Sequence, residues 1–211
     1  MKNLIDKFKS ISKIQIFAVV LIVVGLAIMI PKGLGMFDFY KEVQYANLHN
    51  FRAGNLSPDL LRPWMTIRYI SAAYAVPQKY LFDAIGIQPK NETSMIALNR
   101  LNVQMKLGKN NGSPVLIKTV QDAILAYRAN PVVTGLIERK VSDWMNVQYI
   151  ANSTGIPAAD IFQQIGIPMD GNAYLPLGYL SDSIHYSGGS KALLTAIQKI
   201  VDSQSGQPAQ P

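Results

Sequence analysis

The sequence contains no cysteine and only two histidines in its 211 residues. The lack of cysteine excludes structural disulfides, thiolate metal sites, covalent c-type haem attachment and a cysteine nucleophile. The two histidines, His49 and His185, lie in different regions, and neither has a possible metal ligand at a suitable spacing. We interpret both as ordinary surface or loop residues, and we expect no cofactor and no metal.

Motifs of catalysis are also missing from the sequence. It has no glycine-rich phosphate loop, no Gly-x-Ser-x-Gly elbow and no His-rich tract. Asp170-Gly171-Asn172 is too short a carboxylate run for a calcium loop and predicts a turn instead. A serine or aspartate nucleophile needs an activating base, and none stands at a recognisable spacing. The sequence therefore predicts a protein that is not an enzyme.

One long apolar run predicts a membrane anchor. The stretch IQIFAVVLIVVGLAIMI, from Ile14 to Ile30, is apolar except for Gln15. At a rise of about 1.5 Å per residue it reaches about 25 Å, so flanking interfacial residues can complete a hydrocarbon core of ~30 Å. A cleaved signal peptide is the weaker interpretation, because no small-x-small cleavage site follows. The expected membrane-interface residues are Lys13, Lys32, Phe37, Phe39 and Tyr40, although the three aromatic residues could equally begin the packing of a following helix.

Lysines are concentrated before this span. The first 13 residues hold four lysines and one aspartate, whereas the two lysines that follow the span are accompanied by two acidic residues. The positive-inside rule then places the N-terminus in the cytoplasm and the body in the periplasm. We expect a single-pass protein of the bacterial inner membrane, which contacts the lipid bilayer.

After the span, one sequence motif occurs twice. WMTIRYISAAYAVPQKYLFDAIGI, residues 64–87, is followed by WMNVQYIANSTGIPAADIFQQIGI, residues 144–167. Nine of the aligned positions are identical, which indicates a duplication. Apolar residues recur at spacings of three and four, as in helices that present one face to a core. Pro77 and Pro157 are expected at first helical positions, and Gly86 and Gly166 are expected to end these helices.

The resemblance between the copies continues more weakly beyond residue 87, so each module is expected to have four short helices. GKNNGSP, from Gly108, and HYSGGS, from His185, predict loops, and Ser57 is expected to cap a short helix that begins at Pro58. Asn130-Pro131 is the expected hinge between the modules. The predicted fold class is all-α: one N-terminal transmembrane helix and two tandem small modules of the helix-turn-helix or SAM-like type. The expected segments are a cytoplasmic basic tail (1–13), the transmembrane helix (14–31), a linker or juxtamembrane helix (32–57), module 1 (58–130), module 2 (131–201) and a disordered tail (202–211).

The second copy of the repeat has the small-residue and turn spacing of DNA-reading helix-turn-helix motifs, at Ala151, Gly155-Ile156 and Ile161. A reading helix needs basic and amide side chains for bases and phosphates. The candidate reader PAADIFQQ, from Pro157, has no positive charge, and residues 141–190 contain no Lys or Arg. Module 1 is more basic, but Asp83 stands in its candidate reader. We therefore expect no nucleic acid partner.

A tryptophan opens both copies of the repeat. It is either a partner-binding anchor or, as we favour, a large core residue whose indole N–H finds a carbonyl. The same two alternatives apply to the tyrosine and the phenylalanine that are identical in both copies. The candidate core or anchor residues are Trp64, Tyr69, Phe82, Trp144, Tyr149 and Phe162.

The repeated motif resembles a known helical module. Its elements in the first copy are Trp64-Met65-Thr66, Ile70, Val76-Pro77 and Leu81. They resemble the W-M-T, I-A-x-x-x-G-V-P and L-x-x-L-G-[IL] phrases of small modules appended to bacterial respiratory membrane proteins of the DUF4405 and NapH-like types. Asn146 replaces the threonine in the second copy, and Ser71 and Ala75 replace the usual alanine and glycine in the first. The resemblance covers about a quarter of the chain and implies a non-catalytic extramembrane module associated with electron-transfer membrane proteins. Because this sequence lacks their polytopic and iron-sulfur portions, their redox function does not carry over.

Three functions follow as hypotheses. The leading one is a non-catalytic accessory subunit of a respiratory or photosynthetic membrane complex, whose periplasmic repeats contact other subunits. The alternative is a membrane-tethered helix-turn-helix transcription regulator, which requires a cytoplasmic body. A third, an enzyme or ligand binder with a cleft between the modules, has no support in the sequence.

Overall fold

The computed structural model describes residue 54, residues 56–138 and residues 140–204. All described residues belong to one compact unit within Asn50–Pro211. The predicted basic tail, the transmembrane helix and the five membrane-interface residues lie outside the described residues. Among the residues that are described, no helix is both long enough and apolar enough to cross a membrane.

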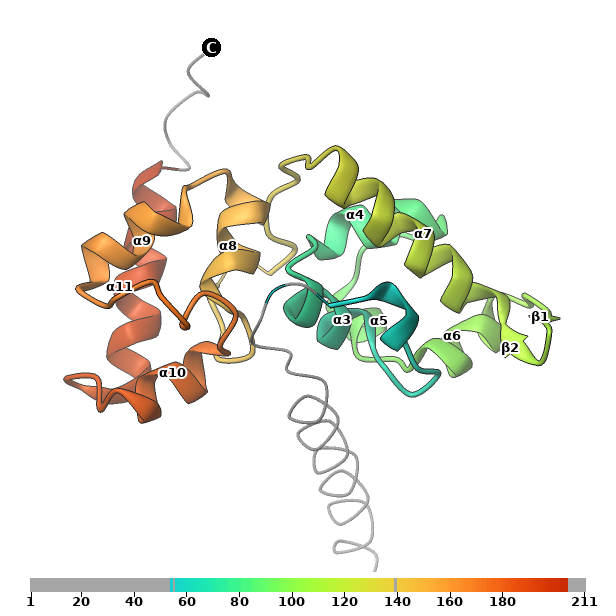
Figure 1. Ribbon diagram of the computed structural model, residues 1–211, viewed down its shortest axis with the longest axis horizontal. Helices are drawn as coiled ribbons and strands as arrows, with labels where there is room; N and C mark the ends of the chain where they lie inside the picture. The colour runs from blue at the N-terminus through green and yellow to red at the C-terminus, as the bar shows by residue number, and fades with distance from the viewer. Residues whose placement is uncertain (1–53, 55, 139, 205–211) are drawn as a thin grey trace, which may run out of the picture. The chain divides into compact units, whose positions relative to one another are not determined.

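The described unit is mostly helical, which confirms the all-α fold class (Figure 1). Module 1 comprises η2 (Pro58–Leu60), α3 (Ile67–Tyr74), α4 (Gln78–Ile85), α5 (Asn91–Ser94), α6 (Leu98–Gln104), β1 (Lys109–Asn110), β2 (Ser113–Pro114) and α7 (Val115–Ala129). Module 2 comprises α8 (Val147–Thr154), α9 (Ala158–Ile165), α10 (Leu177–Ser183) and α11 (Gly189–Gln204).

The repeat in the sequence is also a repeat in the backbone. The helices α3, α4, α6 and α7 correspond in order to α8, α9, α10 and α11. One tie recurs in both copies: the amide of Leu98 donates to the carbonyl of Met65 at 2.8 Å, and that of Leu177 donates to the carbonyl of Met145 at 2.7 Å. This bond fixes the start of the third main helix against the segment that precedes the first, so duplicated residues produce duplicated contacts.

Helix ends follow the predicted signals with one shift. Gly86 and Gly166 end α4 and α9 in the left-handed region, with φ of 75° and 69°, and the Ser57 side chain caps η2. The predicted helix starts at Pro77 and Pro157 are wrong by one position, because each proline is the N-cap residue and not the first helical residue. Their ψ values of 132° and 133° are extended, so the helix starts one residue later.

The predicted loop GKNNGSP contains a small hairpin, which corrects the expectation of a loop without strands. β1 and β2 pair antiparallel, with Asn110 opposite Ser113. Asn111 and Gly112 between them have φ of 49° and 81°. In a two-residue hairpin, a turn with positive φ at both residues matches the twist of the flanking strands. Asn-Gly is the preferred sequence of such a turn.

The predicted tail begins too early. The helix α11 continues to Gln204, three residues past the boundary expected at residue 201. Bonds within the helix accompany this extension: Gln198 Nε2 donates to Asp202 Oδ1 at 2.8 Å, and the Ser203 hydroxyl donates to the Ile200 carbonyl at 2.8 Å. The DSQ stretch has no apolar side chain to bury, but the side chains of Asp202 and Ser203 are bonded within the helix.

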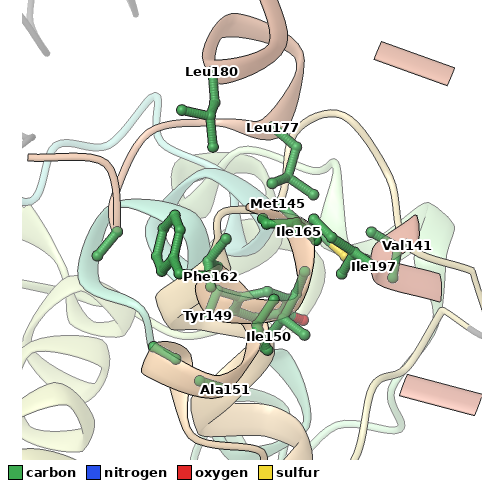
Figure 2. Close-up of a cluster of buried hydrophobic side chains, with 14 of the residues drawn as sticks. Val141, Met145, Tyr149, Ile150, Ala151, Phe162, Ile165, Leu177, Leu180 and Ile197 are labelled. Atoms are coloured by element: carbon green, nitrogen blue, oxygen red, sulfur yellow. The ribbon is translucent and has the colours of Figure 1, made fainter. Parts of the chain in front are cut away.

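Each module buries the apolar face of its helices. In module 2, side chains from all four helices and from the segment before α8 meet in one cluster (Figure 2), which includes Val141, Met145, Tyr149, Ile150, Phe162, Ile165, Leu177, Leu180 and Ile197. Module 1 buries a corresponding set of apolar side chains, which includes Met65, Ile70, Leu81, Phe82, Leu98, Leu116 and Ile124. The helix α7 packs on α4 and α6.

Tyr127 on α7 makes the stability of the fold depend on pH in the alkaline range. Only 4% of it is exposed, and its ring centroid lies 5.1 Å from that of Tyr80. Burial, and secondarily the proximity of Tyr80, raises the pKa of Tyr127 to about 12. Above pH 10 the unfolded chain therefore loses this proton while the folded chain keeps it, so stability falls as pH rises.

We expect the free energy of unfolding to fall between pH 10 and pH 12, with Tyr127 contributing up to ~1.4 kcal/mol per pH unit. Denaturant titrations of the wild type and of Tyr127→Phe measure this contribution as the change in their difference with pH. That difference is expected to be constant below pH 9 and to move in favour of the variant above pH 10. An unchanged difference up to pH 12 would contradict the assignment.

Candidate functional site: the junction between the repeated modules

The six predicted aromatic residues occupy two kinds of place. Phe82, Phe162 and Tyr149 are at most 2% exposed and belong to the module cores. Trp64 and Trp144 are only partly buried, and each ring lies against a tyrosine of its own copy: the centroids are 5.4 Å apart for Trp64 and Tyr69, and 5.2 Å apart for Trp144 and Tyr149. The repeat thus places the same tilted aromatic pair in both modules.

Trp144 also belongs to a polar group that joins the modules. Its indole Nε1 donates to Glu138 Oε2 at 3.4 Å, so the expected carbonyl partner is a carboxylate instead. The second oxygen of Glu138 lies 2.6 Å from Arg68 Nη2, and the Arg68 guanidinium stands 5.2 Å from the centroid of the Trp144 ring. A cation over an indole face is attracted to its electrons. Arg68 of α3 is therefore held by two groups of module 2.

Two asparagines of module 2 complete this junction. Asn146 Oδ1 accepts from the amide of Tyr149 at 2.7 Å and so caps α8, while its Nδ2 donates to the carbonyl of Ala72 at 2.7 Å. Asn152 Nδ2 donates to the carbonyl of Ala75 at 2.7 Å. These carbonyls lie in the last turn and at the C-cap of α3, where carbonyls lack the i+4 amide of a continuing helix, and that of Ala72 has only the Ala75 amide at 3.4 Å within the cap. Module 2 thus satisfies the end of a helix in module 1.

The junction is made where the two copies differ. Asn146 replaces Thr66 of the first copy, Asn152 replaces Ala72, and Arg68 stands where the second copy has Gln148. These changed positions supply the bonds to the α3 carbonyls and the cation of the contact, whereas Trp144, which is identical in both copies, and Glu138, which lies outside the repeat, hold that cation. Sequence reasoning missed the junction, although the replacement of a threonine by Asn146 was its one visible signal.

The junction continues into the core of module 2. Ala75, at φ 51°, is 1% exposed and joins the buried cluster of that module. Burial raises the pKa of the Tyr149 hydroxyl well above its usual range, and interactions with Ser153 and with the Gln78 backbone oppose this shift without cancelling it. The Tyr149 hydroxyl therefore stays protonated and approaches α4 of module 1 as a neutral hydrogen-bonding group.

The polar groups of the junction are engaged with one another. Within the described ranges, no group of three or more His, Asp or Glu side chains is placed to hold a metal ion. The carboxylate of Glu138 is occupied by Arg68, Trp144 and Ser142, whose hydroxyl donates to Oε2 at 3.1 Å. These contacts tie the Glu138 side chain to α3 and to the segment before α8. The chemistry of the junction is recognition between helices.

The repeated helix pairs are α3–α4 and α8–α9, and their surfaces differ from those of a DNA reader. α9 carries Asp160 and no Lys or Arg. On α4, the one lysine, Lys79, lies 2.7 Å from Asp83 in an exposed ion pair. Phosphate binding depends on available positive charge, and these two helices supply little of it.

We expect Asn146→Ala to lower the free energy of unfolding by about 2 kcal/mol, because it removes both a helix cap and the bond to the Ala72 carbonyl. Thr66→Ala is the matched control: Thr66 caps α3 by accepting from the Tyr69 amide at 3.1 Å, so its loss costs only the cap, about 1 kcal/mol. Denaturant titration measures both. Equal losses in the two variants would show that the bond across the junction contributes nothing.

Comparison of the chain with protein-family models, with curated protein sequences and with solved structures finds no match.

Proposed function

We propose that the protein is a non-catalytic, single-pass accessory subunit of a bacterial electron-transfer membrane complex, whose tandem helical modules contact other subunits. The observation that supports this proposal is the junction, in which Arg68, Asn146 and Asn152 join one copy of the repeat to the other. Repeated modules that contact their neighbours build an extended surface for protein partners. A junction of directional hydrogen bonds and an ion pair keeps the two surfaces in register.

The outer surfaces of the two modules differ far more than their cores. Residues 58–130 hold nine Lys or Arg and four Asp or Glu. Residues 131–201 hold four Lys or Arg and five Asp or Glu. Large apolar side chains are also exposed at different places, with Leu125 at 52% in module 1 and Tyr179 at 49% in module 2. Duplication with divergent surfaces is what a scaffold needs when each module meets a different partner.

The class of partner rests on the motif resemblance alone. The W-M-T and V-P modules are associated with respiratory membrane proteins, and a photosynthetic complex fits as well. The periplasmic location follows from the lysines that precede the predicted span. The regulator hypothesis has weaker support, because α9 lacks basic residues and the basic residue of α4 is paired.

Native membranes test the proposal directly. We expect the tagged full chain, solubilised in mild detergent, to co-migrate with a larger assembly on native gels and to co-purify with its subunits. The variant Asn146→Ala/Asn152→Ala is expected to weaken this association, and Thr66→Ala serves as the control that keeps the junction. Recovery of the wild type only as a free monomer would overturn the proposal.

A reporter fused after Asp202 tests the location separately. A reporter that is active in the periplasm agrees with the accessory subunit. One that is active only in the cytoplasm would contradict this topology and favour the membrane-tethered regulator.

A further inference from the structure

Most cations of module 1 already have partners within the described chain. Arg68 pairs with Glu138, Lys79 with Asp83 and Lys118 with Asp122. Arg128 lies over the ring of Tyr74 at 5.6 Å, and Arg62 donates to the carbonyls of Asp59 and Leu61. The module's other cations have no carboxylate within ion-pair distance among the described residues, and they are Lys90, Arg100, Lys106 and Lys109.

These cations fall within one stretch of the chain. Residues 90–109 hold all four and only one acidic residue, Glu92. The concentration is not a property of the whole module, because the cations outside this stretch are engaged elsewhere. The stretch comprises α5, α6 and the start of the hairpin, and it carries the available positive charge of module 1.

The same stretch exposes apolar side chains. On α6, Arg100 and Val103 are exposed and stand three residues apart, which places them on one face of the helix. Val103 is 73% exposed, more than any other exposed large hydrophobic residue described. Met95, at the C-cap of α5, is 61% exposed. Aliphatic side chains flanked by cations are the composition of surfaces that lie at a membrane interface.

The cations that follow α6 are held in place. Asn102 on the buried side of α6 is 3% exposed; its Nδ2 donates to the Leu107 carbonyl at 2.7 Å and to the Gly108 carbonyl at 3.1 Å. Its Oδ1 accepts from the amide of Leu116 at 3.0 Å. One side chain thus ties the end of α6 to the start of α7, with the hairpin beside it (Figure 1). Lys106 and Lys109 are presented from a fixed loop.

We propose that this surface, formed by Met95, Arg100, Val103, Lys106 and Lys109 and here called the α6 surface, docks on an anionic lipid bilayer. Its aliphatic side chains enter the headgroup layer, and its cations lie against lipid phosphates with their alkyl stems along apolar surface. The inference rests on the membrane anchoring in the proposed function. The bilayer is the partner that this anchoring keeps within reach: residues 31–53 can span at most about 80 Å, which raises the effective concentration of the surface at the membrane.

The absence of cysteine makes the test direct, because Val103→Cys provides a unique site for an environment-sensitive fluorophore. The full chain is reconstituted in vesicles of phosphatidylcholine alone or with phosphatidylglycerol, each with a trace of brominated lipid as a quencher. We expect quenching of this label to be about fivefold stronger with phosphatidylglycerol, because each cation near an anionic surface adds to the attraction. A label at Val133→Cys, which is 62% exposed outside the α6 surface, is expected to show no such difference.

Charge reversal on the labelled chain separates lipid binding from crowding at the vesicle. Arg100→Glu/Lys106→Glu/Lys109→Glu is expected to remove the phosphatidylglycerol effect. The matched control reverses the same number of exposed cations in module 2 and is expected to keep the effect; its positions are Lys140, Lys191 and Lys199. Far-UV circular dichroism verifies that both variants remain helical.

Two results would overturn the inference. The first is equal quenching in the two lipids, or quenching that survives charge reversal on the α6 surface. The second is a label that is shielded in native membranes but never quenched by lipid, which would assign the surface to an acidic protein. Failure of the chain to co-migrate with a larger assembly overturns the proposed function and leaves the lipid measurement intact.

Discussion

Truncation of Phe162 to alanine is expected to lower the free energy of unfolding by about 3–5 kcal/mol. The Phe162 side chain is 2% exposed and lies in the cluster with Tyr149 and Ile150 (Figure 2). The substitution removes the whole phenyl ring from a packed interior, so the loss combines the free energy of burial with that of the cavity left behind. Denaturant titration of the full chain in detergent, followed by far-UV circular dichroism, measures the loss.

The duplicated position Phe82 supplies a matched second variant. Phe82 is 0% exposed in module 1, so Phe82→Ala is expected to cost a similar amount. Because the junction joins the modules, we expect a single transition that either variant shifts as a whole. Two separate transitions, each shifted by only one variant, would contradict a coupled pair. A loss below 1 kcal/mol from Phe162→Ala would contradict the placement of this ring in the core.

Much of the fold was predictable because it depends on local signals and on repetition. The spacing of apolar residues gave the main helices, and Gly86 and Gly166 gave two helix ends, since only a residue tolerant of positive φ ends a helix in this way. The alignment of the two copies then identified equivalent core positions. Errors occurred at element ends, where one extended ψ at a proline moves a helix start by one residue.

The candidate site was less predictable for a physical reason. Arg68 and Glu138 stand 70 positions apart, and Asn146 and Ala72 stand 74 apart. No local pattern encodes which side chain meets the end of α3, because this depends on how one module packs against the other. The repeat draws attention to identical residues, whereas the contact mostly uses residues that differ, with Trp144 as the exception. Differences between the copies are therefore the better guide to contacts between them.

Removal of the Glu138 carboxylate, by Glu138→Ala, is expected to lower the free energy of unfolding by about 2–3 kcal/mol. The side chains of the Arg68–Glu138 pair are only 24% and 14% exposed, so the substitution leaves a mostly buried guanidinium without its counter-charge. The partial exposure keeps the loss below that of a fully buried pair. The indole of Trp144 and the hydroxyl of Ser142 also lose their acceptor.

An apolar replacement of both residues separates the loss of the ion pair from the cost of burying an unpaired charge. Arg68→Met/Glu138→Leu is expected to be closer to wild type than Glu138→Ala, because an apolar pair of similar volume removes the cost of burying an unpaired charge. The exposed pair Lys79–Asp83, with side chains 46% and 53% exposed, is the control, and Asp83→Ala is expected to cost at most ~0.5 kcal/mol. If Glu138→Ala cost no more than Asp83→Ala, the ion pair would be a surface contact that contributes nothing to joining the modules. If only Glu138→Ala weakens both stability and co-migration with the larger assembly, then the register between the modules is itself what the partner requires.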